Sequence, residues 1–170
     1  KWLISLHIPD IVVHLAARVG GIQDNIKYPA DYFDDNILIN TNIVKVCKEY
    51  NVKRFIGILS TCIYPSVVKN YPMKEEDLFI GPPPPSNFSY GYAKRCLAVQ
   101  IDAYNKQFGT KYNYLIPCNL YGDYDNMHDE SKMHFITALL NKIRNSKDKA
   151  LHLLGTGKPL RQFMYAGDLA

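Results

Sequence analysis

A phenol and an ammonium group stand four residues apart in this sequence, at Tyr90 and Lys94. If the segment around them is a helix, this spacing stacks both side chains on one face. A cation beside a phenol favours the phenolate, so we expect Lys94 to lower the pKa of Tyr90 from its usual value of about 10. A tyrosine tuned in this way can give or take a proton near neutral pH.

Two further reactive groups follow an apolar run upstream of this pair. Ser60 comes directly after residues 55–59, which predict a buried strand, so its hydroxyl should lie where the strand ends and a loop begins. A hydroxyl there could hold a carbonyl or alcohol oxygen beside Tyr90. Cys62 lies two residues further on and adds a second, distinct acid/base group.

The bulk composition is that of an ordinary globular protein, with 170 residues, 47% hydrophobic and 21% charged. The net charge of +4 comes without a basic tract, which argues against a nucleic-acid binder. Four well-separated cysteines form no CxxC pair, which favours free thiols in a reducing compartment over a disulfide framework or a zinc site. No apolar run is long enough to span a bilayer and the N-terminus is not signal-like, so we expect a cytoplasmic protein.

The order of apolar patterns predicts an α/β fold. Continuous β-branched runs predict buried strands, periodic apolar residues predict helices, and residues 16–28 and 60–88 read as loops. We expect strands at residues 11–15, 53–59, 112–117, 151–154 and 162–165, and helices at residues 29–51, 89–108 (capped by Ser89) and 133–145. Alternation of apolar strands with helices predicts a Rossmann-like, doubly wound parallel sheet covered on both faces. Ligands bind such sheets outside the carboxyl ends of the strands, where the candidate groups are expected.

A glycine-rich turn for the pyrophosphate of a dinucleotide is missing, since the sequence contains neither GxGxxG nor GxxGxxG. The Gly20-Gly21 pair follows the first predicted strand but leads into no clear helical pattern. We therefore interpret the chain as a fragment that lacks the first strands of a Rossmann-like domain.

Eight motifs that occur in order along the chain resemble the GDP-L-fucose synthases, a group within the extended short-chain dehydrogenase/reductase family. They are residues 14–21 (HLAARVGG), 25–28 (NIKY), 60–65 (STCIYP), 81–83 (GPP), 86–88 (SNF), 117–122 (PCNLYG), 125–126 (DN) and 155–157 (GTG). The resemblance covers nearly the whole chain from about residue 9, and the ordered set is far more specific than Tyr90 and Lys94 alone. Enzymes of this group use NADPH to convert GDP-4-keto-6-deoxy-D-mannose into GDP-L-fucose, by epimerisation at C3 and C5 and reduction at C4.

The resemblance implies a role for each reactive group. Tyr90 is then the proton donor when hydride reaches C4, Lys94 holds the nicotinamide ribose and supports Tyr90, and Ser60 hydrogen-bonds the sugar O4. Cys62 and a histidine are then the acid/base pair for C3 and C5. This pairing fits the chemistry, because a 4-keto group acidifies both neighbouring C–H bonds and inversion needs a proton removed from one face and delivered to the other.

Two histidines compete for the second epimerisation role. His134 precedes an apolar stretch ending in Ala-Leu-Leu, as the resemblance requires, and is our choice. His128 is the alternative. A thiolate/imidazole pair can titrate near neutral pH.

The resemblance also implies binding residues for cofactor and substrate. Contacts with NADP are expected from Ala16, Ala17, Ile58, Leu59, Ser60, Thr61, Lys94, Pro117, Cys118, Asn119, Leu120 and His134. Substrate contacts are expected from Lys142, Leu154 and Arg161, whose two cations can neutralise a diphosphate. Leu154 stands where the family usually has a tryptophan.

The predicted division of the chain is a truncated NADP-binding Rossmann-like domain over residues 1–118 and the start of a substrate-binding region over residues 119–170. The resemblance further implies a homodimer formed by the helices at residues 29–51 and 89–108. No metal, nucleic acid or membrane partner is expected. The alternatives are another nucleotide-sugar epimerase or dehydratase, or a truncated or degenerate homologue that binds a nucleotide or a partner without catalysis.

Overall fold

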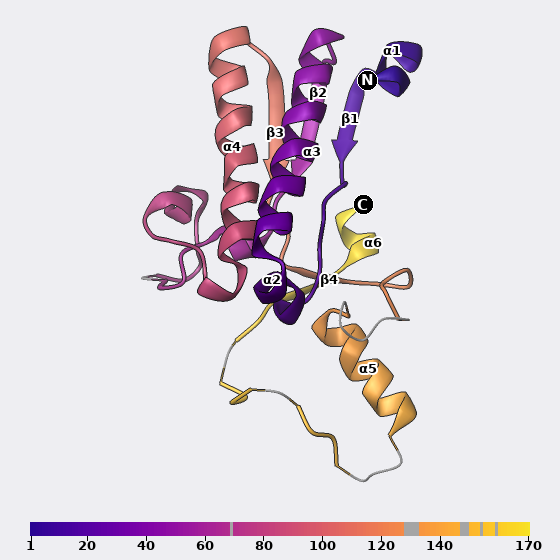
Figure 1. The fold of residues 1–170 in the computed structure, drawn as a ribbon, viewed down its shortest axis with the longest axis vertical. Coiled ribbons are helices and arrows are strands. Elements are labelled where there is room, and N and C mark those ends of the chain that lie inside the picture. Colours follow the sequence, from indigo (N-terminus) through magenta and orange to yellow (C-terminus); the bar gives the residue numbers. More distant parts are fainter. Residues whose placement is uncertain (69, 128–132, 147–149, 154, 159) are drawn as a thin grey trace.

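The computed structural model describes residues 1–68, 70–127, 133–146, 150–153, 155–158 and 160–170. Its centre is a parallel sheet of three strands, β1 (Ile11–His14), β2 (Arg54–Ile58) and β3 (Lys111–Leu115), in the order β1-β2-β3 (Figure 1). Phe55 of β2 pairs in register with Val12 on one side and Tyr112 on the other. The predicted strands at residues 11–15, 53–59 and 112–117 and the α/β class with a parallel sheet are thus confirmed.

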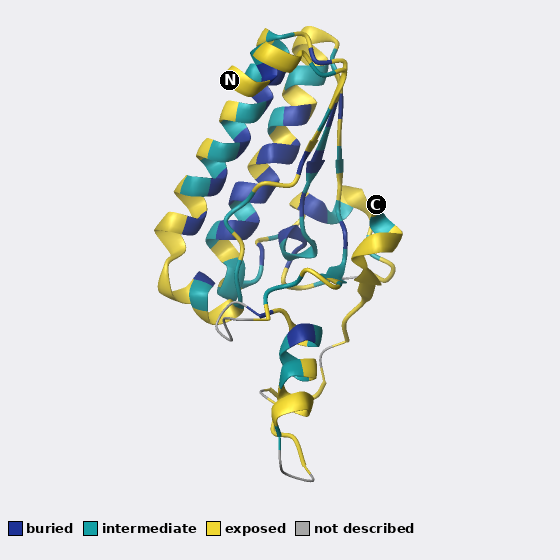
Figure 2. Ribbon diagram, turned by 90° about the vertical axis from the view of Figure 1, so that its right-hand side faces the viewer, coloured by how far each residue is buried: buried dark blue, intermediate teal, exposed yellow. Residues whose placement is uncertain are grey.

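Two long helices, α3 (Pro29–Glu49) and α4 (Phe88–Phe108), pack side by side on one face of this sheet (Figures 1 and 2). Pro29 occupies the first turn of α3, where its missing N–H costs no hydrogen bond. Gly109 ends α4 in the left-handed conformation at φ 65°, as predicted. Ser89 is not the N-cap, because α4 begins one residue earlier and Asn87 occupies that position.

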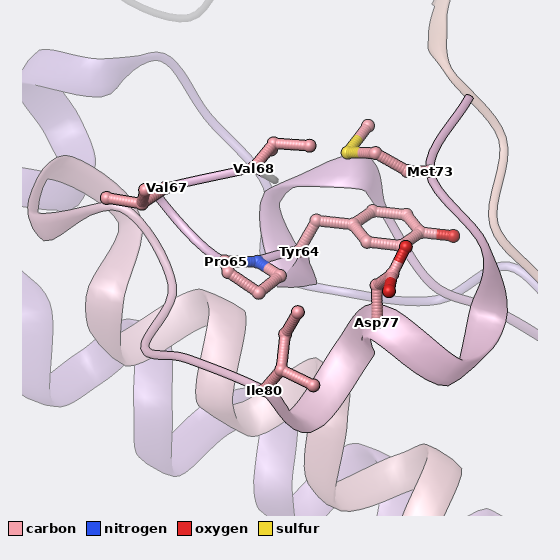
Figure 3. Close-up of a pocket in the computed structure, with 7 residues that line it drawn as sticks. All are labelled: Tyr64, Pro65, Val67, Val68, Met73, Asp77 and Ile80. Carbon is pink, nitrogen blue, oxygen red and sulfur yellow. The ribbon is translucent and has the colours of Figure 1, made fainter. Parts of the chain in front are cut away.

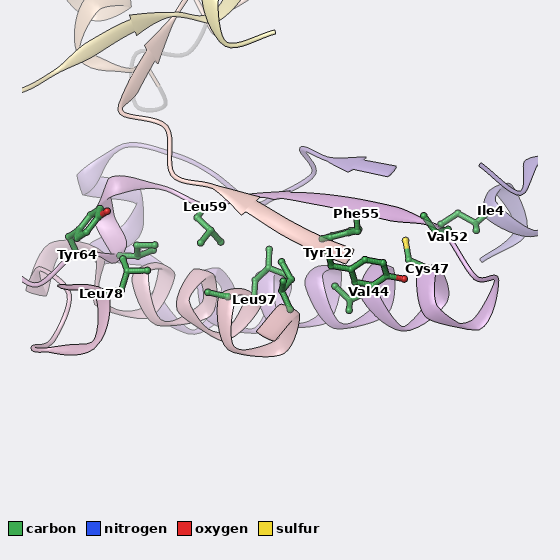
Figure 4. Packing of buried hydrophobic residues seen from close by; sticks show 13 residues of the cluster. Ile4, Val44, Cys47, Val52, Phe55, Leu59, Tyr64, Leu78, Leu97 and Tyr112 are labelled. Carbon is green, nitrogen blue, oxygen red and sulfur yellow. The ribbon is translucent and has the colours of Figure 1, made fainter. Parts of the chain in front are cut away.

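The hydrophobic core fills the layer between the sheet and these helices (Figure 4). Phe55 and Tyr112 point into it from neighbouring strands with ring centroids 5.5 Å apart, and both side chains are almost fully buried. Val44 of α3 and Leu97 of α4 meet them from the helices. This layer fixes the distance between α4 and the ends of the strands, and so positions the residues that follow.

The opposite face of the sheet differs from the prediction. Ile11, Val13 and Leu115 are exposed, by 53%, 56% and 44%, although apolar strands predicted cover on both faces. Among the described residues, the two long helices lie on the same side, so the apolar pattern indicates a face that α3 and α4 do not cover.

The other elements are short. They are α1 (Trp2–His7), α2 (Ile22–Lys27), the 3-10 turns η1 (Thr61–Ile63), η2 (Glu75–Phe79) and η3 (Pro85–Asn87), the parallel pair β4 (Asn119–Tyr121) and β5 (Phe163–Tyr165), α5 (Phe135–Asn145) and α6 (Ala166–Leu169). Within the described ranges, no helix has the length and apolar character needed to cross a membrane.

Three of these elements correct the sequence predictions. The Gly20-Gly21 pair does lead into a helix, α2, where the buried Asn25 donates its side-chain amide to the carbonyls of both glycines. β4 lies where we predicted no strand, and its three residues pair with the distant β5. Residues 151–153 form no strand, and Leu154 lies outside the described residues.

Candidate active site at the carboxyl edge of the sheet

The segments expected to contact a cofactor follow the three parallel strands directly. His14 at the end of β1 pairs with Gly57, and Ile58 at the end of β2 pairs with Leu115, so all three strands end at one edge. The predicted residues just beyond these ends are Ala16 and Ala17 after β1, Leu59, Ser60 and Thr61 after β2, and Pro117 and Cys118 after β3. Asn119 and Leu120 lie in β4. The topology therefore brings the three segments that follow β1, β2 and β3 to the same edge of the sheet.

Tyr90 and Lys94 stand one turn apart on α4, as their spacing predicted, and both are buried. The Lys94 amino group donates to the Ile58 carbonyl at 2.9 Å, which ties the helix to the end of β2. Ser60 caps the turn η1, where its hydroxyl accepts a hydrogen bond from the Cys62 N–H at 3.3 Å. Ser60 and Cys62 also lie close enough to Tyr90 to influence its ionisation, so the structure assembles these four residues.

A glycine allows α4 to approach the turn that carries Cys62. A Cβ added at Gly91 would lie 2.7 Å from the Pro83 Cβ and 2.9 Å from the Cys62 carbonyl oxygen, both shorter than real contacts. Gly91 is therefore the position at which the helix and η1 touch through their backbones. Because Gly91 has no side chain, the Cys62 carbonyl can lie close to the helix.

Arg95 also holds the turn η1, a role that the sequence patterns did not predict. Its Nε donates to the Ile63 carbonyl at 2.6 Å, and the side chain is 5% exposed. The guanidinium also lies over the rings of Phe79 and Tyr92. Arg95 follows Lys94 directly, so consecutive residues of α4 hold the end of β2 and the turn after it.

Burial dominates the proton chemistry of Tyr90 and corrects our expectation. Burial raises the pKa of Tyr90 well above its usual value, the nearby Cys62 adds to this, and the Ser60 hydrogen bond opposes it. Lys94 does not lower the pKa, because its amino group bonds to Ile58 and lies 5.9 Å from the centre of the phenol ring. Burial also lowers the pKa of Lys94 to about 8.

A polar network backs the phenol ring from α3. The Tyr32 ring meets the Tyr90 ring edge to face with centroids 6.3 Å apart. The Tyr32 hydroxyl donates to Asp24 at 2.5 Å, and Arg18 lies over the Tyr32 ring while pairing with Asp35. The network ties the segment after β1 to the face of α3 that contacts Tyr90.

His14 is part of the support and not of the reacting set. Its Nε2 lies 3.0 Å from the Asn40 Oδ1, and the ring is buried against Phe55. Burial lowers the pKa of His14, so the ring is neutral at pH 7.

His134 lies at the start of α5, apart from the group formed by Ser60, Cys62, Tyr90 and Lys94. Its Nδ1 is 3.3 Å from an oxygen of Asp125, a residue that belonged to one of the matched motifs but was given no role. Within the described part of the chain, no hydrogen bond or ion pair joins His134 to Cys62 or Tyr90. His128 lies outside the described residues.

The predicted substrate residues are on the surface of the C-terminal segment. Lys142 of α5 donates to the His152 carbonyl at 3.1 Å, and Arg161 is exposed. Leu154 is not among the described residues. The structure thus places these two cations in the segment after β4 without joining them to the groups around Tyr90.

Two hollows in the surface are separate from this site. One, of about 10 Å³, lies beside the loop after η1 and holds no more than a water molecule (Figure 3). It is lined by Tyr64, Pro65, Val67, Val68, Met73, Asp77 and Ile80. The other, of about 450 Å³, lies at the amino ends of β2 and β3, the end of the sheet opposite Tyr90. Neither contains the predicted reactive groups.

Comparison with known protein families matches residues 2–170 to the NAD dependent epimerase/dehydratase family. The chain belongs to this family. The match spans both the sheet with its Tyr90 and Lys94 edge and the segment that carries His134.

Individual relatives confirm the resemblance that the motifs predicted. A GDP-L-fucose synthase of Dictyostelium discoideum is 47% identical over 166 residues, which cover 95% of this chain and 51% of that protein. A GDP-L-fucose synthetase from Naegleria fowleri, whose crystal structure has NADP bound, is 36% identical, with a TM-score of 0.85 over 98% of this chain and 55% of that one. A UDP-glucose 4-epimerase from Thermotoga maritima, 25% identical, also has a TM-score of 0.85, over 99% of this chain and 52% of that one. The chain spans about half the length of the curated relatives it matches.

We predict that Gly91→Ala destabilises the protein, although alanine elsewhere in a helix stabilises it by about 1 kcal/mol over glycine. The added Cβ meets Pro83 and the Cys62 carbonyl, so η1 must shift. The measurement is the thermal unfolding midpoint of this variant beside Ser89→Ala, a neighbouring change on α4. A raised midpoint for Gly91→Ala would show that the helix and the turn are not in close contact.

We predict that Lys94 makes the protein more stable as the pH rises from about 8 to about 10.5. The folded state releases the Lys94 proton near pH 8, whereas the unfolded state keeps it to about 10.5, so the unfolded state binds more protons in this window. The gain over Lys94→Met should reach the order of 3 kcal/mol. The difference in unfolding free energy between the two proteins, measured by urea titration at several pH values, cancels the other titrating groups; a flat difference would contradict the prediction.

Proposed function

We propose that this chain supplies the reacting groups of an NADPH-dependent GDP-L-fucose synthase, which epimerises GDP-4-keto-6-deoxy-D-mannose at C3 and C5 and reduces it at C4. The observation that carries the proposal is the position of Cys62, whose backbone bonds to Ser60 and whose thiol influences Tyr90, because reduction alone requires no thiol. The Dictyostelium discoideum relative, which has this name, supports it. Since the chain spans about half of that relative, we propose the activity for a longer protein that includes these residues.

In the reduction, Tyr90 donates a proton to the oxygen at C4. Its raised pKa supports this role, because the phenol keeps its proton at neutral pH and is available as an acid. The Ser60 hydroxyl holds the same sugar oxygen. Tyr32 and the backbone contact at Gly91 keep the Tyr90 ring in place.

The residues at the carboxyl edge fit the nicotinamide end of NADPH, which when bound supplies the hydride for C4. Lys94 is buried there, with a polar contact to the end of β2, and we propose that it also holds the ribose. The other proposed contacts are Ala16, Ala17, Ile58, Leu59, Ser60, Thr61, Pro117, Cys118, Asn119, Leu120 and His134. The pyrophosphate end does not fit these residues, since the sequence has no glycine-rich turn, and we propose that residues outside this sequence hold it.

In the epimerisation, Cys62 and His134 exchange protons with C3 and C5. The keto group at C4 makes both C–H bonds acidic, and the two groups act from opposite faces of the sugar. Their different elements support this division, since Cys62 lies on η1 and His134 at the start of α5. The group formed by Ser60, Cys62, Tyr90 and Lys94 must then approach His134 around the bound substrate.

The C-terminal segment would bind the nucleotide. We propose that residues 1–118 form the NADP-binding unit and that residues 119–170 begin the substrate-binding region. Lys142 and Arg161 would neutralise the diphosphate, with Leu154 beside the nucleotide. The exposed positions of Lys142 and Arg161 support this, because an anionic ligand can reach them.

We propose a cytoplasmic homodimer that uses the outer surfaces of α3 and α4. Phe33 and Leu38 on α3 and Val99 on α4 are exposed by 38%, 59% and 54%, and together offer apolar surface for a second copy. The four cysteines are free thiols, as a reducing compartment requires.

A second candidate is a homologue that binds a nucleotide or a partner and catalyses nothing. The feature that favours it is the missing glycine-rich turn, because a site without its cofactor cannot reduce the sugar. Another nucleotide-sugar epimerase is less well supported, although the fold itself is shared with a UDP-glucose 4-epimerase.

We predict that the full-length protein oxidises NADPH when given GDP-4-keto-6-deoxy-D-mannose, and that Cys62→Ser lowers GDP-L-fucose formation by roughly 100-fold or more. The assay follows NADPH absorbance and separates the sugar nucleotides by chromatography. Cys96→Ser, which changes an exposed thiol on α4, is the matched control and should leave the rate unchanged. A full-length protein that oxidises no NADPH would exclude the proposed function, and normal product formation by Cys62→Ser would remove that residue from the mechanism.

A further inference from the structure

Asp125 joins the loop after β4 to the first turn of α5. Its side chain is 15% exposed, and both carboxylate oxygens have partners. Oδ1 accepts from the Asn126 N–H at 2.9 Å and lies 3.3 Å from Nδ1 of His134. Oδ2 accepts from the hydroxyl of the buried Thr137. The Asp125 carboxylate is therefore held by several hydrogen bonds, one of which joins it to the imidazole of His134.

The first turn of α5 presents both partners to Asp125 at once. His134 precedes the helix and Thr137 follows three residues later, so the two side chains lie on one face. The start of a helix carries partial positive charge, which also favours a carboxylate there. The arrangement keeps Asp125 and the ring of His134 together although α5 is largely exposed.

The carboxylate decides which ring nitrogen of His134 can carry a proton. Burial alone would raise the pKa of Asp125, but the hydrogen bonds from Thr137, His134 and Asn126 outweigh it and lower the pKa. An ionised carboxylate accepts hydrogen bonds and donates none. Nδ1 of a neutral His134 must therefore bear the hydrogen, which leaves the lone pair on Nε2.

We propose that Asp125 is a positioning residue that fixes His134 as the Nδ1–H tautomer and presents Nε2 as the nitrogen that exchanges protons with the substrate. The role of Nε2 rests on the proposed function, whereas the tautomer does not. Asp125 would act through His134 and make no contact with the reacting atoms itself. Thr137 donates a hydrogen bond to the Asp125 carboxylate and so helps to position it.

The tautomer is measured by long-range proton–nitrogen NMR correlation on the protein labelled with 15N histidine, with His134→Gln to assign the signal. The expected result is the Nδ1–H form for His134, whereas histidine in water favours Nε2–H. Asp125→Ala should shift His134 to Nε2–H, and Asp125→Glu should restore part of the Nδ1–H population. Asp123→Asn, a change at an exposed acid of the same loop, is the control and should leave the spectrum unchanged.

Two outcomes would overturn the proposal. One is an Nε2–H tautomer of His134 in the unchanged protein, a measurement that does not depend on a variant folding. The other is an unchanged tautomer in Asp125→Ala. In the activity assay, Asp125→Ala should lower kcat for epimerisation by about 100-fold with little change in KM, and Asp125→Glu should recover part of it. Absence of turnover in the full-length protein, with the Nδ1–H tautomer present, would exclude the proposed function and still support the positioning by Asp125.

Discussion

The close packing of α4 against the end of β2 and the turn after it is the constraint on which the candidate site depends. Gly91 brings the two backbones into contact, Lys94 bonds to the Ile58 carbonyl and Arg95 bonds to the Ile63 carbonyl. Because all three residues lie within two turns of one helix, the element that carries the phenol also holds the turn that carries Cys62. Displacing α4 would move Tyr90 away from the turn that carries Cys62.

Burial then determines which proton states these groups adopt. Tyr90 and Lys94 are both nearly inaccessible, and the cost of holding charge away from water favours the neutral form of each. The pKa of Tyr90 rises and that of Lys94 falls, in opposite directions but for one reason. A protonated phenol suits an acid that donates to a forming alkoxide. His134, half-exposed and paired with Asp125, has a different environment suited to a different proton transfer.

The sequence predicted the parts of the fold that depend on local patterns. Continuous apolar runs located β1, β2 and β3, and periodic apolar residues predicted a helix at 29–51 where α3 covers Pro29–Glu49. β4 was missed because three residues are stabilised by pairing with a strand far along the chain. α2 was missed because six residues give little periodicity, and part of its support comes from the Asn25 side chain.

The candidate site divides in the same way. Strand ends and helical spacing were enough to predict that Ser60, Tyr90 and Lys94 lie together. The pKa prediction for Tyr90 was wrong because spacing reveals the nearby cation but not the burial of both groups or the carbonyl that binds Lys94. The pairing of Asp125 with His134 crosses a loop, so no local pattern could reveal it.

The proposed enzyme both inverts carbons and reduces a ketone in one site, and the origin of the product's hydrogens tests this directly. The full-length protein is incubated with the keto-sugar nucleotide and NADPH in deuterium oxide, and the product is analysed by mass spectrometry and NMR. We expect deuterium from solvent at both C3 and C5 and hydrogen from NADPH at C4. Reduction at C4 with no deuterium at C3 or C5 would contradict it and leave a simple reductase.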